Sequence, residues 1–336
     1  MVVAYHVGHA FDGLPKVGVM DEIASSAFVG ISNGLGAVVA FFVISGFVLA
    51  RSLDANPDAT RFFTHRLLRL FPAAVAVVSL LAAVHYSLGI YVGHEASFDP
   101  FNILLNMLMI RSDINVPMWS LTVECFAAPI IFLGVFLFRR RGVLPLWILV
   151  AVLFGLSFWG PYVHMLGGAT NLAPLYAFIV GIIVHFEGGR LTGNLSSRAA
   201  TYGALLSLLI FFICGFKKQT APILALECLS AASIAALVAY SNTSISKPLD
   251  FRLVRFYGQI SYSFYLLHML GILMSFRLIE PLKLSGGSVF GARVLTTLVA
   301  ILCTTPAAYL FWKFIEIPAI QIGRAIKPPQ FKVDHR

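Results

Sequence analysis

Long apolar runs, separated by shorter polar and charged segments, follow one another along the whole sequence. Helices that cross a bilayer need about 17 to 25 predominantly apolar residues, and most of these runs approach or reach that length. The pattern predicts ten helices, the first of them an incomplete run that ends near Phe11. The other nine are expected at about 34–50, 70–88, 118–138, 144–159, 172–186, 199–216, 221–240, 259–276 and 289–314. We therefore expect an all-α, polytopic integral membrane protein, organised as a single membrane-embedded domain over residues 1–336.

The remaining segments are predicted to lie outside these helices. They are a polar stretch at 12–33, a charged loop at 51–69, a mixed segment at 89–116 with a short apolar patch at 101–110, and a basic, proline-containing tail from Glu316. No internal repeat is visible. The pattern gives no sign of the mirrored halves that are typical of many transporters.

Composition agrees with the apolar pattern. Of the 336 residues, 59% are hydrophobic and only 12% are charged, whereas a soluble domain has about 25% charged residues. The net charge of +9 does not indicate a nucleic-acid partner, because the cationic residues lie between the apolar runs rather than on one face. Seventeen of the 24 lysines and arginines fall in segments that would lie on the same side of the membrane as the N-terminus. This bias predicts cytoplasmic N- and C-termini in a cell inner (plasma) membrane.

Several kinds of site have no support in the sequence. All four cysteines lie in apolar runs and none forms a CxxC pair, so packing is a better interpretation than a disulfide or a metal site. There is no P-loop, GxGxxG, HExxH or GxSxG pattern. Soluble nucleotide-binding and serine-hydrolase chemistries are therefore not expected.

Two groups of ionisable residues stand out as candidates. His6 lies within the first apolar run, and an ionisable residue in a membrane segment is a functional hypothesis by default. Arg66 and Arg69 are three residues apart and share a helix face, with Arg61 and His65 nearby. They are either ordinary cytoplasmic flanking charges or a site for a phosphorylated cytosolic ligand, because the arginine fork binds phosphate well.

Three further residues have both a structural and a functional interpretation. Glu124 lies in an apolar run, where a carboxylate needs either a basic partner that locks two helices together or a catalytic task. His268 is either a hydrogen-bonded packing residue or a catalyst, and Glu316 is either functional or marks a helix end stopped by proline. Glu227 has no assigned role. Four other histidines are interpreted as non-catalytic: His85, His94, His164 and His185.

Taken together, six segments of the chain resemble the acyltransferase-3 family of membrane O-acyltransferases. Each segment alone is a weak signal, but their order and spacing across nearly the whole chain are specific. They are YHVGHAF at 5–11, FFVISGFVLA at 41–50, HRLLRLFP at 65–72, WSLTVECF at 119–126, SYSFYLLH at 261–268 and FIEIP at 314–318. The resemblance implies about ten membrane helices and transfer of acyl groups, often acetyl, from a cytosolic donor to carbohydrates.

The resemblance also implies roles for individual residues. His6 is the expected catalytic histidine, with Glu124 and His268 as further catalytic candidates. Cys125 stands where a second acidic residue is usual in the family. The expected acyl-donor-binding residues are Arg66 and Arg69 together with Arg61, and the other motif residues are Trp119, Ser120, Tyr262 and Glu316. The implied partners are acyl-CoA as a co-substrate, a carbohydrate or glycolipid acceptor and the lipid bilayer, with no permanently bound cofactor.

One family feature has no counterpart here. The family pairs its first-helix histidine with an arginine about ten residues earlier, but only five residues precede His6. We expect either that the start has been assigned too late or that this is a degraded copy. The chain from Met1 is expected to be impaired or inactive.

The expected activity is O-acyl transfer to a sugar hydroxyl. His6 would act either as the general base or as the group that carries the acyl chain, and Glu124 would orient its ring. Two alternatives remain open. One is a transporter or flippase for polysaccharide or acylated precursors, in which intramembrane His and Glu side chains relay protons or bind substrate. The other is an inactive, truncated family member.

Overall fold

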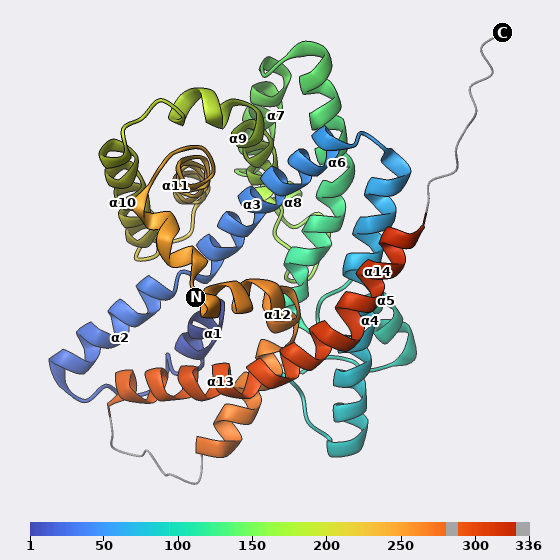
Figure 1. Ribbon diagram of the computed structural model, residues 1–336. Helices are drawn as coiled ribbons and strands as arrows, with labels where there is room; N and C mark the ends of the chain where they lie inside the picture. The colour runs from blue at the N-terminus through green and yellow to red at the C-terminus, as the bar shows by residue number, and fades with distance from the viewer. Residues whose placement is uncertain (94, 280–287, 327–336) are drawn as a thin grey trace.

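The computed structural model describes residues 1–93, 95–279 and 288–326, and its regular secondary structure in these ranges is entirely helical. The α-helices form one bundle, through which α3 runs diagonally; α12 packs mainly against α13, and α9 and α11 pack against α3 (Figure 1). Their bounds are α1 Val2–Ala10, α2 Gly18–Ser32, α3 Gly34–Ala55, α4 Ala59–Leu88, α5 Pro100–Met107, α6 Trp119–Arg141, α7 Leu144–Leu156, α8 Gly160–Val163, α9 Tyr176–Thr192, α10 Ser197–Cys214, α11 Ala221–Tyr240, α12 Arg252–Ile279, α13 Val289–Phe311 and α14 Ile317–Ala325.

Within the described residues, eight helical segments are long and apolar enough to cross a membrane, which confirms a polytopic, all-helical membrane protein. The segments are Gly18–Ala55, Ala59–Leu88, Val116–Arg141, Ala173–Thr192, Ser197–Cys214, Ala221–Tyr240, Arg252–Ile279 and Val289–Ala325. Two of the ten predicted helices are shorter: α1 has 9 residues and α7 has 13. His94 and the last ten residues of the tail lie outside the described residues.

The prediction of a polar stretch without a helix at 12–33 was wrong, because α2 occupies 15 of these residues. One of its polar side chains, Asp21, caps the start of another helix. The Asp21 carboxylate accepts hydrogen bonds from the backbone N–H groups of Val289 and Phe290 and from the Ser288 hydroxyl, at 3.0, 2.9 and 2.6 Å. These donors belong to the start of α13 and have no partners within that helix. Asp21 therefore ties α2 to a helix far away in the sequence.

The prediction of a charged loop at 51–69 was also wrong. Helix α3 continues to Ala55 and α4 begins at Ala59, so only residues 56–58 connect them. The Asp58 side chain caps α4 by accepting the Arg61 backbone N–H at 2.9 Å. The arginines of this segment consequently lie on a helix, where their relative directions are fixed.

The last membrane helix does not end before Pro318 as predicted. It passes through a π-helical turn at Trp312–Glu316 and continues as α14. Pro318 lies in the first turn of α14, directly after the π-helical turn. Glu316 is thus the last residue of the π-helical turn that connects α13 to α14, and the helical segment does not end there.

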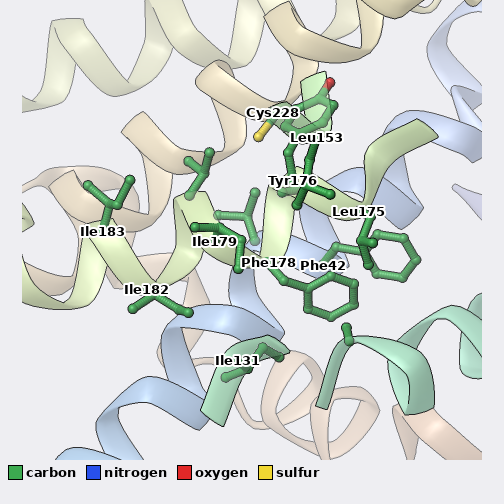
Figure 2. Packing of buried hydrophobic residues seen from close by; sticks show 14 of the residues in the cluster. Phe42, Ile131, Leu153, Leu175, Tyr176, Phe178, Ile179, Ile182, Ile183 and Cys228 are labelled. Atoms are coloured by element: carbon green, nitrogen blue, oxygen red, sulfur yellow. The ribbon is translucent and has the colours of Figure 1, made fainter. Parts of the chain in front are cut away.

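The largest hydrophobic cluster centres on the crossing of α3 and α9 (Figure 2). Glycines allow the two backbones to touch: a Cβ at Gly46 would lie 2.1 Å from the Phe178 carbonyl oxygen, and one at Gly181 would lie 2.1 Å from that of Val43. Beside the crossing, the rings of Phe42 and Phe178 stack with centroids 4.4 Å apart. This packing holds α3 in place, and α3 forms one wall of the cavity described next.

Candidate functional site

A cavity of about 630 Å³ lies between α3, α4, α6 and α12, and Val2 of α1 also reaches it. We call it the donor cavity, after the role that is proposed for it below. Most of its wall is apolar. Its basic groups all come from α4, where Arg61, His65, Arg66 and Arg69 line it. These positions recur at intervals of about one helical turn, so α4 presents a basic face to the cavity.

A buried ion pair forms part of the cavity wall. The Arg66 Nη2 atom lies 2.8 Å from Glu124 Oε1, and the two side chains are only 8% and 5% exposed. Ser45 Oγ donates to the same carboxylate oxygen at 3.0 Å. The ionic contact is not aligned as a hydrogen bond, and Arg66 Nε and Glu124 Oε2 also lack hydrogen-bond partners. Two charged groups with spare hydrogen-bonding capacity therefore line the cavity.

The arginines predicted to act together have different surroundings. Arg66 is buried and faces Glu124, whereas the side chains of Arg61 and Arg69 are exposed. All three line the donor cavity. The structure thus leaves Arg61 and Arg69 free to reach a ligand entering from solvent, and it holds Arg66 deeper in the wall.

The two candidate histidines meet although they are 262 positions apart in the sequence. The ring centroids of His6 on α1 and His268 on α12 lie 5.3 Å apart, with the planes tilted by 36°. His268 is 1% exposed, and its Nδ1 lies 2.5 Å from the Tyr265 carbonyl oxygen. Because a carbonyl can only accept, Nδ1 carries a proton. The Nε2 atom of His268 has no hydrogen-bond partner in the protein.

Tyr265 connects this histidine pair to the donor cavity. Tyr265 lines the cavity, and its hydroxyl donates to the Pro117 carbonyl oxygen at 2.7 Å and lies 2.8 Å from Ser120 Oγ. Neither histidine lines the cavity itself, but Val2 lies one helical turn before His6 and Tyr265 lies one turn before His268. The cavity wall therefore includes one residue within a helical turn of each histidine. Sequence reasoning missed Tyr265, although its three-residue spacing from His268 places both on one helix face.

Residues 1–313 match the family model for an acyltransferase domain, the acyltransferase-3 domain. The chain belongs to the acyltransferase-3 family. No curated protein and no solved structure matches it. Membership in this family suggests an acyltransferase activity and implies an acyl donor and an acceptor that meet in a bilayer.

Three other predicted motif residues of this acyltransferase-3 chain have packing contacts. Trp119 meets the Phe42 ring edge-on, with centroids 6.4 Å apart. The Tyr262 hydroxyl donates to the Leu70 carbonyl oxygen at 2.9 Å, and Glu316 accepts from Ser263 at 2.9 Å. These bonds tie α12 to α4 and to the π-helical turn. Of the three, only Tyr262 lines the donor cavity.

Glu227, which had no predicted role, is the centre of a second buried polar cluster. Its Oε1 accepts from the side-chain amides of Asn33 and Gln219, at 2.9 and 3.3 Å. No cation is among these partners. In the part of the acyltransferase-3 chain that the structure describes, no group of three or more His, Cys, Asp or Glu side chains could hold a metal ion.

Proposed function

We propose that this protein is a membrane O-acyltransferase. In this proposal it moves an acyl group, with acetyl as the first candidate, from cytosolic acyl-CoA to a hydroxyl of an extracytoplasmic or lipid-linked carbohydrate. One observation carries the proposal: the donor cavity is lined both by the basic side chains of α4 and by Val2, which lies one helical turn before His6 on α1. An acyl-CoA molecule has the matching order of parts, with phosphates at one end and a thioester at the end of a long arm.

The exposed arginines supply the phosphate-binding end. Arg61 and Arg69 offer planar guanidinium forks, which form paired hydrogen bonds with phosphate oxygens. Arg66 contributes differently, because its contact with Glu124 holds it in the wall. The apolar remainder of the cavity accommodates the pantetheine arm and acyl chain, and it excludes water from the thioester.

The histidine pair supplies the proton transfer. His6 removes the proton from the acceptor hydroxyl, whose oxygen attacks the thioester carbonyl carbon. The carbon–sulfur bond then breaks, and the departing sulfur takes the proton from the His6 imidazolium. In this scheme the Nε2 of His268, which has no hydrogen-bond partner among the described residues, accepts an N–H from His6, and the other His6 nitrogen is the base. In the covalent variant of this scheme, His6 first accepts the acyl group and then passes it to the hydroxyl.

Transfer by the purified protein, with and without His6→Ala, tests the proposal. Loss of a general base lowers rates by about 10²- to 10⁴-fold, and we expect a decrease in this range. His164→Ala is the matched control, because His164 is exposed and lies in a loop away from both histidines. Full transfer by His6→Ala would refute the catalytic role, and movement of a carbohydrate without acyl turnover would favour a transporter.

A further inference from the structure

A second hollow lies at the other end of α1. It has a volume of about 320 Å³ and is lined by Asp12 and Lys16 after α1, Ser25 and Ser26 of α2, Phe216 after α10, and Arg293 of α13. We call it the distal hollow. Gly30 and Gly215 also line it, and their backbones are in close contact, because a Cβ on Gly215 would lie 2.1 Å from the Gly30 carbonyl oxygen. The donor cavity and the distal hollow have no lining residue in common.

Helix α1 places His6 between the two spaces. Val2 at its start lines the donor cavity, and Asp12, just beyond its end, lines the distal hollow. His6 is four residues from the first and six from the second. At a rise of 1.5 Å per residue, Ala10 at the end of α1 is about 6 Å from His6 along the helix axis, and Asp12 lies two residues further on. A molecule of a few sugar units held in the distal hollow spans that distance.

The charges in the distal hollow favour an anion. Arg293 is 2% exposed, and it donates to the Ser25 carbonyl oxygen at 2.9 Å and to Asp12 Oδ1 at 2.8 Å. The other carboxylate oxygen of Asp12 lies 2.7 Å from His9 Nδ1. Both carboxylate oxygens of Asp12 therefore have partners. Lys16 is exposed and forms no ion pair with the described residues. The lining of the distal hollow thus contains two cations, Lys16 and Arg293, and one carboxylate, that of Asp12.

The polar groups around the guanidinium are incompletely satisfied by the protein. Arg293 Nε and the hydroxyl of Ser25, which is 0% exposed, have no hydrogen-bond partner in the chain. Buried polar groups of this kind usually have partners, so each one requires an explanation. Both residues line the distal hollow, and the side chains of Ser26 and Phe216 beside them are exposed. The hollow thus combines donors, positive charge and an accessible aromatic face.

We propose that the distal hollow binds the acyl acceptor as a sugar that carries a negative group, either a carboxylate or a phosphate. This inference rests on the proposed function, since it identifies the acceptor side of the same reaction. Lys16 contacts the charged group, Ser26 hydrogen-bonds to a hydroxyl, and the Phe216 ring packs against the apolar face of the sugar. The acceptor thereby approaches His6 from the end of α1 opposite to the donor.

Equilibrium dialysis of the full chain in a neutral detergent tests this site with four probes: glucuronate, glucose 1-phosphate, glucose and inorganic phosphate. We expect both charged sugars to bind at least tenfold more tightly than glucose or inorganic phosphate. Lys16→Gln should weaken binding of the charged sugars by about tenfold, which corresponds to about 1.4 kcal/mol. Lys218→Gln is the matched control, because this exposed lysine near Phe216 does not line the hollow, and it should change nothing.

Three results would overturn the inference. They are no preference for charged sugars over glucose, inorganic phosphate binding as tightly as glucose 1-phosphate, and equal losses in Lys16→Gln and Lys218→Gln. Hydrolysis of acyl-CoA without an acceptor is measured on the same variants. We expect Lys218→Gln to leave it unchanged, since Lys218 lines neither the distal hollow nor the donor cavity. Charged-sugar binding that depends on Lys16 in a protein without any acyl-CoA turnover would refute the proposed function while upholding the binding site.

Discussion

Glu124 and Glu227 have similar sequence surroundings but different structural ones. Both lie in long apolar helices, and they are 4% and 0% exposed. Glu124 faces the Arg66 guanidinium and the donor cavity, and Ser45 donates to it. Glu227 accepts only from the amides of Asn33 and Gln219, and it lines neither of the two hollows.

The difference shows that the partner, rather than burial itself, decides what a buried carboxylate does. An ion pair in a low-dielectric interior needs both members, because removal of one leaves an uncompensated charge. A cluster built from amide donors needs hydrogen-bond acceptors but no charge. We therefore interpret Glu124 as part of a charged wall beside a ligand space and Glu227 as a structural link between α11 and the junction of α2 with α3.

The largest expected effect comes from breaking the ion pair. Arg66→Met should lower the stability of the folded protein by about 3–5 kcal/mol, because Glu124 would remain buried without its cation. Thermal unfolding in detergent, followed by circular dichroism, measures the change.

The matched comparison is the double variant Arg66→Met/Glu124→Leu, which removes both charges. It should recover most of the lost stability, since apolar pairs often replace buried ion pairs at little cost. A double variant as unstable as Arg66→Met alone would show that the two residues do not act as a pair.

A smaller effect is expected at the second glutamate. Glu227→Gln keeps an acceptor for the Asn33 and Gln219 amides, so stability should change by less than about 1 kcal/mol. Glu227→Leu leaves both amides unpaired and should cost about 1–3 kcal/mol. The same unfolding assay measures both, and a loss in Glu227→Gln as large as that in Arg66→Met would show that the negative charge matters there too.

The smallest effect is expected from a carboxylate outside the membrane helices. Burial raises the pKa of Asp113, but hydrogen bonds from the side chains of Asn106 and Asn102, at 2.7 and 2.8 Å, outweigh this effect and lower the pKa overall. Because the pKa in the folded state is the lower one, the stabilisation is fully present above the unfolded-state pKa of about 4 and is lost as the pH falls through the folded-state value.

Asp113→Asn should remove this contribution at neutral pH. The stability difference between Asp113→Asn and the unmodified protein should then shrink as the pH is lowered below about 4, because the unmodified carboxyl becomes protonated as well. Unfolding midpoints measured from pH 6 to pH 3 check this, and a difference that stays constant over that range would contradict it.

Much of the fold and part of the site follow from the sequence. Eight of the ten predicted helices correspond to segments able to cross a membrane, and the ordered motifs lead to the family that the match over residues 1–313 confirms. The failures have a common physical cause. Polar residues such as Asp21 and Asp58 resemble loop residues in a hydropathy pattern, yet they cap helices, so the predicted polar stretch and charged loop are largely helical.

Partners across helices could not be predicted. The sequence marks Arg66, Glu124 and His268 as unusual ionisable residues, and it leaves open whether Glu124 has a basic partner or a catalytic task. The structure supplies the basic partner, Arg66, which the sequence could not name, and adds a hydrogen bond from Ser45. Asp12 and Arg293 are 281 positions apart, and only one of them lies in an apolar run. Arg293 within an apolar helix is a further signal in the sequence, because an arginine inside a membrane helix requires a partner.

The sequence by itself determined that this chain is a helical membrane protein of the acyltransferase-3 family, because apolar run length and ordered motifs are local properties of the chain. Only the tertiary structure decided that His6 meets His268. The same holds for the ion pair of Arg66 with Glu124, beside which Arg61 and Arg69 stay exposed. It also holds for the position of α1, which runs from the donor cavity toward the distal hollow. Those features depend on which helix faces pack together, and hydropathy does not encode that choice.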